Sequence, residues 1–199
     1  MSSACSRCLI LVETVFLLGA LAAGLTASIS LLLARDEIPD SNCLLYGTFN
    51  WTGGAVEGDK PRCDLSLVFQ FAVCAVAAVS AVYRCLNIPC EKLDIKCFRV
   101  LSIVIYIVCV ACVLIECILV YYGVVRFCES MIETNSALPE DSSCEDNQLV
   151  YNEQNGTDVD FYGFLKMSTI ASWVSLVTWL ALTVIACVSM CFRKDEYDA

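Results

Sequence analysis

Residues 100–125 read VLSIVIYIVCVACVLIECILVYYGVV, and this stretch decides the fold. Glu116 is the only charged side chain among its 26 residues. A bilayer hydrocarbon core about 30 Å thick needs about 20 apolar residues to be crossed by a helix. The stretch therefore predicts a membrane-spanning helix.

Three further apolar blocks of similar length lie elsewhere in the chain. Of its 199 residues, 58% are hydrophobic, which exceeds the roughly 45–50% of soluble domains. The first block is longer than the 7–15 apolar residues of a signal peptide, so we expect a span, with a cleaved signal as the alternative. The predicted fold is an all-α membrane protein, a bundle of four transmembrane helices forming one domain over residues 1–199, with helices at about 9–33, 65–83, 100–125 and 167–192.

The positions of lysine and arginine predict the orientation, because cytosolic segments are enriched in both. Basic residues flank the helices in the amino terminus, in the connection at about 84–99 and in the tail: Arg7, Arg84, Lys92, Lys96, Arg99, Arg193 and Lys194. The loops at about 34–64 and 126–166 hold fifteen acidic residues and only five basic ones. We therefore expect both termini in the cytosol and these two outer loops in the lumen or the cell exterior.

Each outer loop contains one N-glycosylation sequon, at Asn50 and at Asn155, which agrees with this orientation. Trp51 and three glycines predict a turn-rich first loop with a small β-hairpin or sheet. The second loop is rich in Glu, Asp, Asn and Ser, and it predicts an acidic, solvated flap.

Each outer loop also contains two cysteines, Cys43 and Cys63 in the first and Cys128 and Cys144 in the second. An even number in an oxidising compartment indicates disulfides. Four cysteines allow three pairings, and the sequence leaves all three open. Pairing within each loop is the simplest, and each such bridge contributes roughly 3 kcal/mol by loop-closure entropy.

Two carboxylates lie inside the apolar blocks, where ionisable residues are costly and often functional. Glu13 lies about 6 Å inside the cytosolic edge, counting 1.5 Å per residue. We expect it to reach the headgroups or to pair with Arg84 or Arg99. Glu116 lies near the middle of the membrane and cannot reach either surface.

Polar residues on two other helices lie close to the depth of Glu116. Ser168, Ser172, Ser175 and Thr178 recur at helical spacing in the fourth block. With Gln70 of the second block, Ser175 and Thr178 predict a hydrogen-bonded cluster around a protonated Glu116 that joins the helices. A proton or cation pathway is the alternative.

Eleven further cysteines include two patterns that bear on function. Cys109 and Cys112 form a CxxC, as in membrane thiol oxidoreductases of the vitamin K epoxide reductase type, but they lie about 20 Å below the outer surface and not near it. Six cysteines near the cytosolic helix ends are candidates for S-palmitoylation: Cys5, Cys8, Cys85, Cys90, Cys97 and Cys191.

Other function classes find no support in the sequence. The chain has no histidine and a formal net charge of −10, which argues against a nucleic-acid partner. It contains no Gly-rich phosphate loop and no nucleophile elbow. We therefore expect no catalytic residues, no metal site and no cofactor.

Three short motifs resemble those of a known family: residues 43–47 (CLLYG), 128–132 (CESMI) and 172–179 (SWVSLVTW). They are similar to the transmembrane protein 179 family, most nearly its 179B branch. The resemblance implies a distantly claudin-like, left-handed four-helix bundle with a small extracellular sheet, in the plasma membrane or a secretory or granule membrane. It implies no reaction. The second outer loop is longer than the first and the claudin Gly-Leu-Trp is missing, which disfavours a tight-junction strand role.

The sequence thus favours a non-enzymatic scaffold or accessory subunit that works through its helices and outer loops. Its expected partners are the lipid bilayer and other membrane proteins. The alternatives are a channel or transporter that uses Glu116 and a membrane thiol oxidoreductase that uses Cys109 and Cys112.

Overall fold

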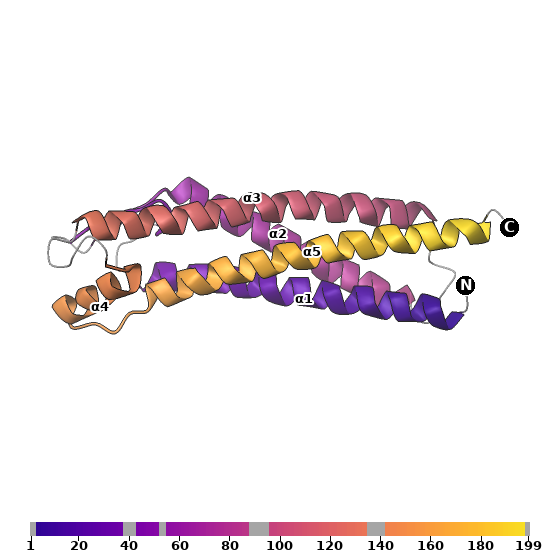
Figure 1. Ribbon diagram of the computed structural model, residues 1–199, viewed down its shortest axis with the longest axis horizontal. Helices are drawn as coiled ribbons and strands as arrows, with labels where there is room; N and C mark the ends of the chain where they lie inside the picture. The colour runs from indigo at the N-terminus through magenta and orange to yellow at the C-terminus, as the bar shows by residue number, and fades with distance from the viewer. Residues whose placement is uncertain (1–2, 38–42, 52–54, 88–95, 135–141, 198–199) are drawn as a thin grey trace.

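The computed structural model describes residues 3–37, 43–51, 55–87, 96–134 and 142–197. In these residues the elements are α1 Ser3–Asp36, β1 Thr48–Asn50, β2 Ala55–Glu57, α2 Lys60–Asn87, α3 Lys96–Thr134, α4 Cys144–Asn155 and α5 Phe161–Tyr197. Figure 1 shows both chain termini at one end of an elongated bundle, here called the terminal end, and α4 at the other. The opposite end carries both disulfides and is called the disulfide end.

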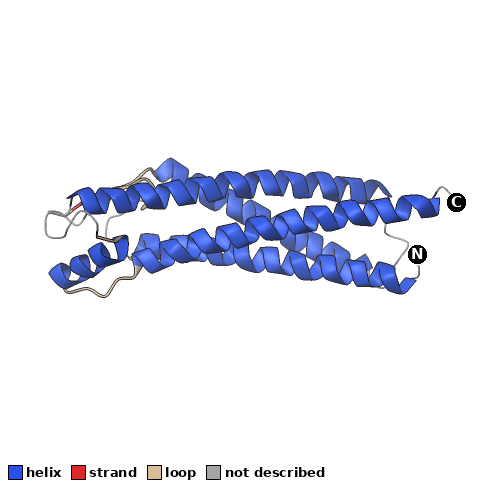
Figure 2. Ribbon diagram, viewed as in Figure 1, coloured by secondary structure: helices blue, strands red, loops and turns tan. Residues whose placement is uncertain are grey.

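Each of the four long helices contains a stretch that is long and apolar enough to cross a membrane. These candidate spans are Cys8–Asp36, Lys60–Leu86, Phe98–Thr134 and Phe161–Cys191. The predicted all-α, four-span fold is thereby confirmed, and the strands occupy only a small part of the disulfide end (Figure 2).

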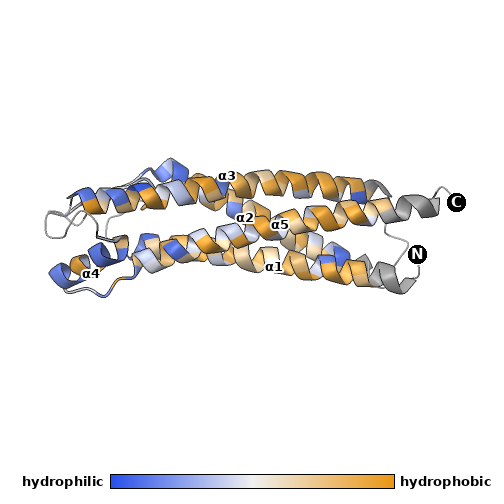
Figure 3. Ribbon diagram, in the orientation of Figure 1, coloured by the Kyte–Doolittle hydropathy of each residue, from blue (hydrophilic) through white to orange (hydrophobic). Residues whose placement is uncertain are grey.

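The helices are longer than the apolar blocks that predicted them. Helix α3 has 39 residues, which at 1.5 Å per residue is about 58 Å, almost twice the thickness of a hydrocarbon core. Figure 3 shows apolar residues along the middle of the bundle and hydrophilic residues gathered toward the disulfide end. The disulfide end therefore projects beyond the apolar part of the bundle.

Helix α1 packs closely because its inward face carries small residues. A Cβ added at Gly24 would lie 2.5 Å from the Sγ of Cys74 on α2, a distance that real contacts do not reach. Nearly one turn further along, the Ala27 carbonyl accepts a hydrogen bond of 3.0 Å from Ser168 Oγ on α5. The first and last helices of the chain are thus direct neighbours, and α1 packs more extensively against α5 than against any other described element.

Two apolar clusters fill the interior. The disulfide-end cluster contains Phe49, Phe127, Tyr151 and Phe161, whose rings meet edge to face with centroids 5.5–6.3 Å apart, a favourable arrangement for aromatic pairs. The terminal-end cluster contains Leu17, Ala77, Val113, Trp179 and Leu182, among others. On α1, α2 and α5, buried polar residues lie between the two clusters, among them Ser28, Gln70 and Ser172.

Each disulfide joins the two cysteines of one outer loop. Cys43 pairs with Cys63, with 6.1 Å between their Cα atoms, and Cys128 pairs with Cys144 at 5.3 Å. The first bridge ties the start of α2 to the chain before β1. The second ties α3 to the start of α4. Of the three pairings that the sequence allowed, the structure has the one within loops.

A two-stranded antiparallel sheet lies against α3. Strands β1 and β2 pair with Phe49 opposite Val56. The Phe49 N–H donates to Ser130 Oγ at 2.9 Å, and Trp51 Nε1 donates to the Met131 carbonyl at 3.3 Å. The predicted hairpin in the first outer loop is present, and α3 holds it in place.

The second outer loop was predicted as a solvated flap, but it contains helix α4. Ser143 caps the helix: its Oγ accepts from the Asp146 N–H at 3.1 Å, and its own N–H donates to the Asp146 carboxylate at 3.0 Å. The Ser143 hydroxyl also donates to the Asp146 carboxylate at 2.7 Å, and this bond and that of the Ser143 N–H hold the pKa of Asp146 below its ordinary value of 3.8. Gly156 ends the helix in the left-handed conformation, with φ 62°. The acidic composition hid these capping signals.

Candidate functional site

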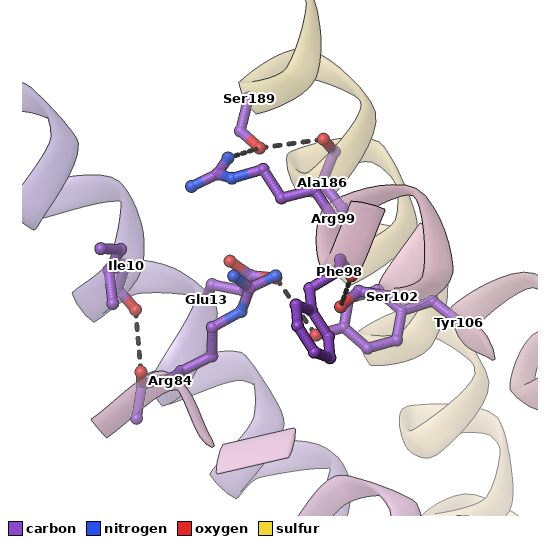
Figure 4. Close-up of polar contacts among 10 residues, drawn as sticks. Ile10, Glu13, Arg84, Phe98, Arg99, Ser102, Tyr106, Ala186 and Ser189 are labelled. Atoms are coloured by element: carbon purple, nitrogen blue, oxygen red, sulfur yellow. Dashed lines mark hydrogen bonds and ion pairs between the residues drawn. The ribbon is translucent and has the colours of Figure 1, made fainter. Parts of the chain in front are cut away.

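A buried ion pair joins α1 to α2 near the terminal end. Arg84 Nη2 lies 2.7 Å from Glu13 Oε1, and the two side chains are only 3% and 2% exposed. The hydroxyl of Tyr106 on α3 donates to the same carboxylate oxygen at 3.1 Å. Figure 4 shows the three side chains converging. The structure thus brings together Glu13 and Arg84, one of the two arginines that the sequence proposed as partners.

The second of those arginines links α3 to the fourth long helix. Arg99 Nη1 on α3 donates to Ser189 Oγ on α5 at 2.8 Å, and Ser189 donates to the Ala186 carbonyl at 2.9 Å (Figure 4). We call Glu13, Arg84, Arg99, Tyr106 and Ser189 the arginine centre. It contains side chains from all four long helices and thereby cross-links the terminal end of the bundle.

A second polar group lies around Glu116, the central residue of the candidate span Phe98–Thr134. Ser172 Oγ on α5 donates to Glu116 Oε1 at 2.8 Å. Ser66 and Gln70, one turn apart on α2, and Ser175 on α5 complete the group, which we call the Glu116 centre. These five side chains are at most 2% exposed.

The Glu116 centre differs from the predicted cluster in three residues, one of which is Ser172, predicted only as part of the polar stripe. Thr178 does not belong to it, because its hydroxyl donates to the Val174 carbonyl at 2.8 Å and its side chain borders an apolar groove on the outside of α5. Trp179, which is fully buried, takes the inward position next to it. Ser66 was missed, although its spacing of four residues from Gln70 places both on one helix face.

Most polar atoms of the Glu116 centre lack hydrogen-bond partners within the described part of the chain. They are Ser66 Oγ, Gln70 Oε1 and Nε2, Glu116 Oε2 and Ser175 Oγ. Ser66 faces the carboxyl group of Glu116 without forming a hydrogen bond of good geometry. The polar groups of Glu13 and Arg99 are therefore hydrogen-bonded, whereas the Glu116 centre is largely unpaired.

A polar cleft of about 410 Å³ lies at the disulfide end, between the first loop and α3. Two ion pairs border it, Arg62 with Asp59 at 2.8 Å and Arg126 with Glu129 at 3.4 Å. The Arg62 guanidinium also lies 4.5 Å from the centroid of the Tyr46 ring. We call this polar cleft the loop cleft. It presents both signs of charge on side chains that are largely exposed.

Tyr46, at the edge of the loop cleft, has an unusual backbone. Its φ of 59° lies in the left-handed region, and it is the only described residue other than glycine with positive φ. Its N–H donates to the Gly123 carbonyl at 3.2 Å. A Cβ added at Gly123 would lie 2.8 Å from the Leu45 side chain. The close approach of this turn to α3 holds the strained residue in place, and such strain is commonest at functional sites.

The remaining predicted residues do not gather into a site. Cys109 is buried in the terminal-end cluster, and Cys112 packs against that cluster. Cys8, Cys85 and Cys191 are exposed, while Cys90 and the side chains of Cys5 and Cys97 lie outside what the structure describes. Palmitoylation of these cysteines stays a prediction.

Glycosylation of the two sequons also stays a prediction. Asn155 is the last residue of α4, is exposed, and donates through Nδ2 to the Tyr151 carbonyl at 2.9 Å. Asn50 ends β1, and its side chain is outside the described set.

Comparison with known proteins gives one family. The model of the transmembrane protein 179/179B claudin domain matches residues 9–198, nearly the whole chain, and does not separate the two branches. No curated protein matches the chain, and no solved structure does.

Proposed function

Because the chain belongs to the transmembrane protein 179/179B family, whose domain is claudin-like, we propose that this multi-pass membrane protein is a non-enzymatic scaffold or accessory subunit. Its partners are other membrane proteins, which it contacts through its disulfide end and along its helices in the bilayer. The observation that carries the proposal is the loop cleft on a rigidly held disulfide end.

Rigidity at the disulfide end favours recognition. Two disulfides, the contacts of β1 with α3 and the aromatic contacts of Phe49 fix this end to the long helices. A binding surface held in this way loses little conformational entropy when a partner docks. The ion pairs of Arg62 and Arg126 are exposed, and such pairs contribute only about 0–1 kcal/mol each. Both arginines can therefore exchange their present partners for charged groups of another protein at little cost.

Orientation is part of the proposal. The disulfide end faces the lumen or the cell exterior, and both termini are cytosolic, in the plasma membrane or a secretory or granule membrane. Disulfides persist in those oxidising compartments, and the basic residues flanking the helices at the terminal end follow the positive-inside rule. A glycosidase should increase the gel mobility of the wild-type protein and leave that of the Asn50→Gln/Asn155→Gln variant unchanged. Unchanged mobility of the wild type, with the terminal end accessible outside intact cells, would reverse the orientation.

Charge reversal in the loop cleft tests the scaffold proposal. We expect Arg62→Glu/Arg126→Glu to release the partner proteins that co-migrate with the wild type on native gels, with normal folding and surface level. Lys166→Glu is the matched control, because Lys166 is exposed and lies outside the cleft. Retention of every partner by the cleft variant would contradict the proposal.

A channel or transporter is the second candidate, favoured by the unpaired polar atoms of the Glu116 centre. Purified protein in liposomes distinguishes the two. A cation or proton flux that Glu116→Gln abolishes would support the transporter and displace the scaffold, whereas we expect no flux from either form. The oxidoreductase alternative gains no support from the described residues, because Cys109 is buried among apolar side chains and the loop cysteines pair with each other.

A further inference from the structure

The Glu116 centre contains more polar atoms than the surrounding protein pairs. Five of its side-chain atoms are buried with no hydrogen-bond partner among the described residues. These atoms come from α2, α3 and α5 and lie on residues that are at most 2% exposed. A buried polar atom without a partner is costly, and native proteins rarely keep several together.

The kind of atoms present indicates what completes the centre. Gln70 Nε2 is a donor, Gln70 Oε1 is an acceptor, and the serine hydroxyls can be either. A metal cation could satisfy only the acceptors, an anion only the donors, and a lipid chain neither. Water satisfies both, and a buried water typically makes about three hydrogen bonds.

The packing around the centre favours a ligand as small as water. At Gly24, which faces the centre from α1, an added Cβ would meet Cys74 Sγ at 2.5 Å and the Gln70 amide at 3.9 Å. Helix α1 therefore lies directly against Gln70 and leaves little space on that side.

We propose that the Glu116 centre is an internal water-binding site, in which a few water molecules join the side chains of α2, α3 and α5. Glu116 takes part as a neutral acid: it accepts from Ser172 through Oε1 and donates to water through Oε2. An ionised carboxylate buried without a cation would be far more costly than the neutral acid. The two apolar clusters close the site toward both ends of the bundle, so the water is held and does not flow through.

The first test removes one hydroxyl at a time. If buried water forms hydrogen bonds with Ser66 and Ser175, then Ser66→Ala and Ser175→Ala each remove one of these hydrogen bonds. We then expect the unfolding temperature to fall by about 2–4 °C. If the centre is dry, the same changes remove unpaired groups and the temperature rises. Ser28→Ala is the matched control, because Ser28 is equally buried but already donates to the Gly24 carbonyl of its own helix at 3.0 Å. A rise in both variants relative to this control would overturn the proposal.

The second test works on the intact protein and does not depend on the serine variants. We expect the infrared spectrum to contain a carbonyl band of a neutral carboxylic acid that disappears in Glu116→Gln. In D₂O that band should shift within minutes, because water carries deuterium to the acid. A band that stays unshifted for hours would show a dry centre, and the absence of any such band would show an ionised Glu116; either result overturns the proposal.

A salt comparison separates water from a bound cation. The unfolding temperatures of the wild type and Glu116→Gln should be equally insensitive to replacing sodium chloride by choline chloride. A sodium-dependent rise that Glu116→Gln removes would assign the site to a cation and overturn the water proposal.

Discussion

Two glutamates lie buried in the same bundle, and their hydrogen-bonding surroundings are opposite. Glu13 and Glu116 are both 2% exposed. Glu13 has a guanidinium at 2.7 Å and a tyrosine hydroxyl at 3.1 Å, whereas Glu116 has one serine hydroxyl at 2.8 Å and an unpaired second oxygen. The difference teaches that two equally buried carboxyl groups need not have the same charge. The site of Glu13 stabilises a charge, and the site of Glu116 accommodates a neutral group.

The largest effect should come from removing the cation of the arginine centre. Arg84→Leu leaves Glu13 without its ion-pair partner, and breaking a buried pair in this way costs about 3–5 kcal/mol. Equilibrium unfolding in mild detergent measures the loss. The double variant Glu13→Arg/Arg84→Glu should recover part of it. A loss for Arg84→Leu of under about 1 kcal/mol would mean that the pair is not a stabilising charge contact.

Neutralising each glutamate in turn tests the contrast directly. Glu13→Gln leaves the Arg84 charge buried, and we expect a loss of about 3 kcal/mol. Glu116→Gln keeps an oxygen that can accept from Ser172, so the loss should stay below about 1 kcal/mol. The same unfolding assay compares the two variants. Equal losses would remove the distinction between the sites.

A smaller effect should follow from removing one hydrogen bond of Glu13. Tyr106→Phe deletes only the hydroxyl that donates to the carboxylate, and hydrogen bonds to charged groups contribute about 1.5–3 kcal/mol. Tyr122→Phe on the same helix is the control, because Tyr122 is 55% exposed. If both variants unfold alike, the Tyr106 hydroxyl does not stabilise the charge of Glu13.

The smallest effect concerns a carboxylate outside the bundle, Asp146, whose charge is stabilised by hydrogen bonds alone. Its pKa is lowered in the folded protein, so its contribution to α4 is complete above the ordinary value of 3.8 and is lost as the pH falls through the lowered value. Ser143→Ala should weaken α4 by about 1 kcal/mol and reduce this pH dependence. Hydrogen exchange of the α4 amides, measured from neutral pH to below 3.8, gives both results. Identical protection in the variant and the wild type would show that the cap does not hold α4.

The sequence predicted well how deep in the membrane a residue lies, but it predicted poorly which side of its helix faces the interior of the bundle. Depth changes by 1.5 Å with each residue whatever the rotation of the helix, so the four spans and the closeness of Glu13 to Arg84 followed from counting. Facing turns by about 100° per residue and depends on how neighbouring helices pack. Thr178 was therefore placed on the wrong side of α5, and it also lies about 9 Å along the helix from Ser172, which contacts Glu116, while Trp179 was overlooked.

The disulfide end was predicted in part. The hairpin could be expected from the glycines and Trp51, and the parity of the cysteines indicated two bridges. Helix α4 was missed because its acidic residues were read as a sign of solvation, although Ser143, Asp146 and Gly156 mark both helix ends. The loop cleft could not be predicted, since it requires α3 to lie beside the first loop, a contact between residues some 80 positions apart such as Phe49 and Ser130.

The direct contact between α1 and α5 has a consequence for how the protein is made. Synthesis begins with α1 and reaches α5 last. The Ala27 carbonyl therefore has no hydrogen bond from Ser168, and Glu116 has none from Ser172, until the final helix enters the membrane. An unfinished or truncated chain exposes both groups to lipid. The last helix to be synthesised thus completes the hydrogen bonds of groups on two earlier helices.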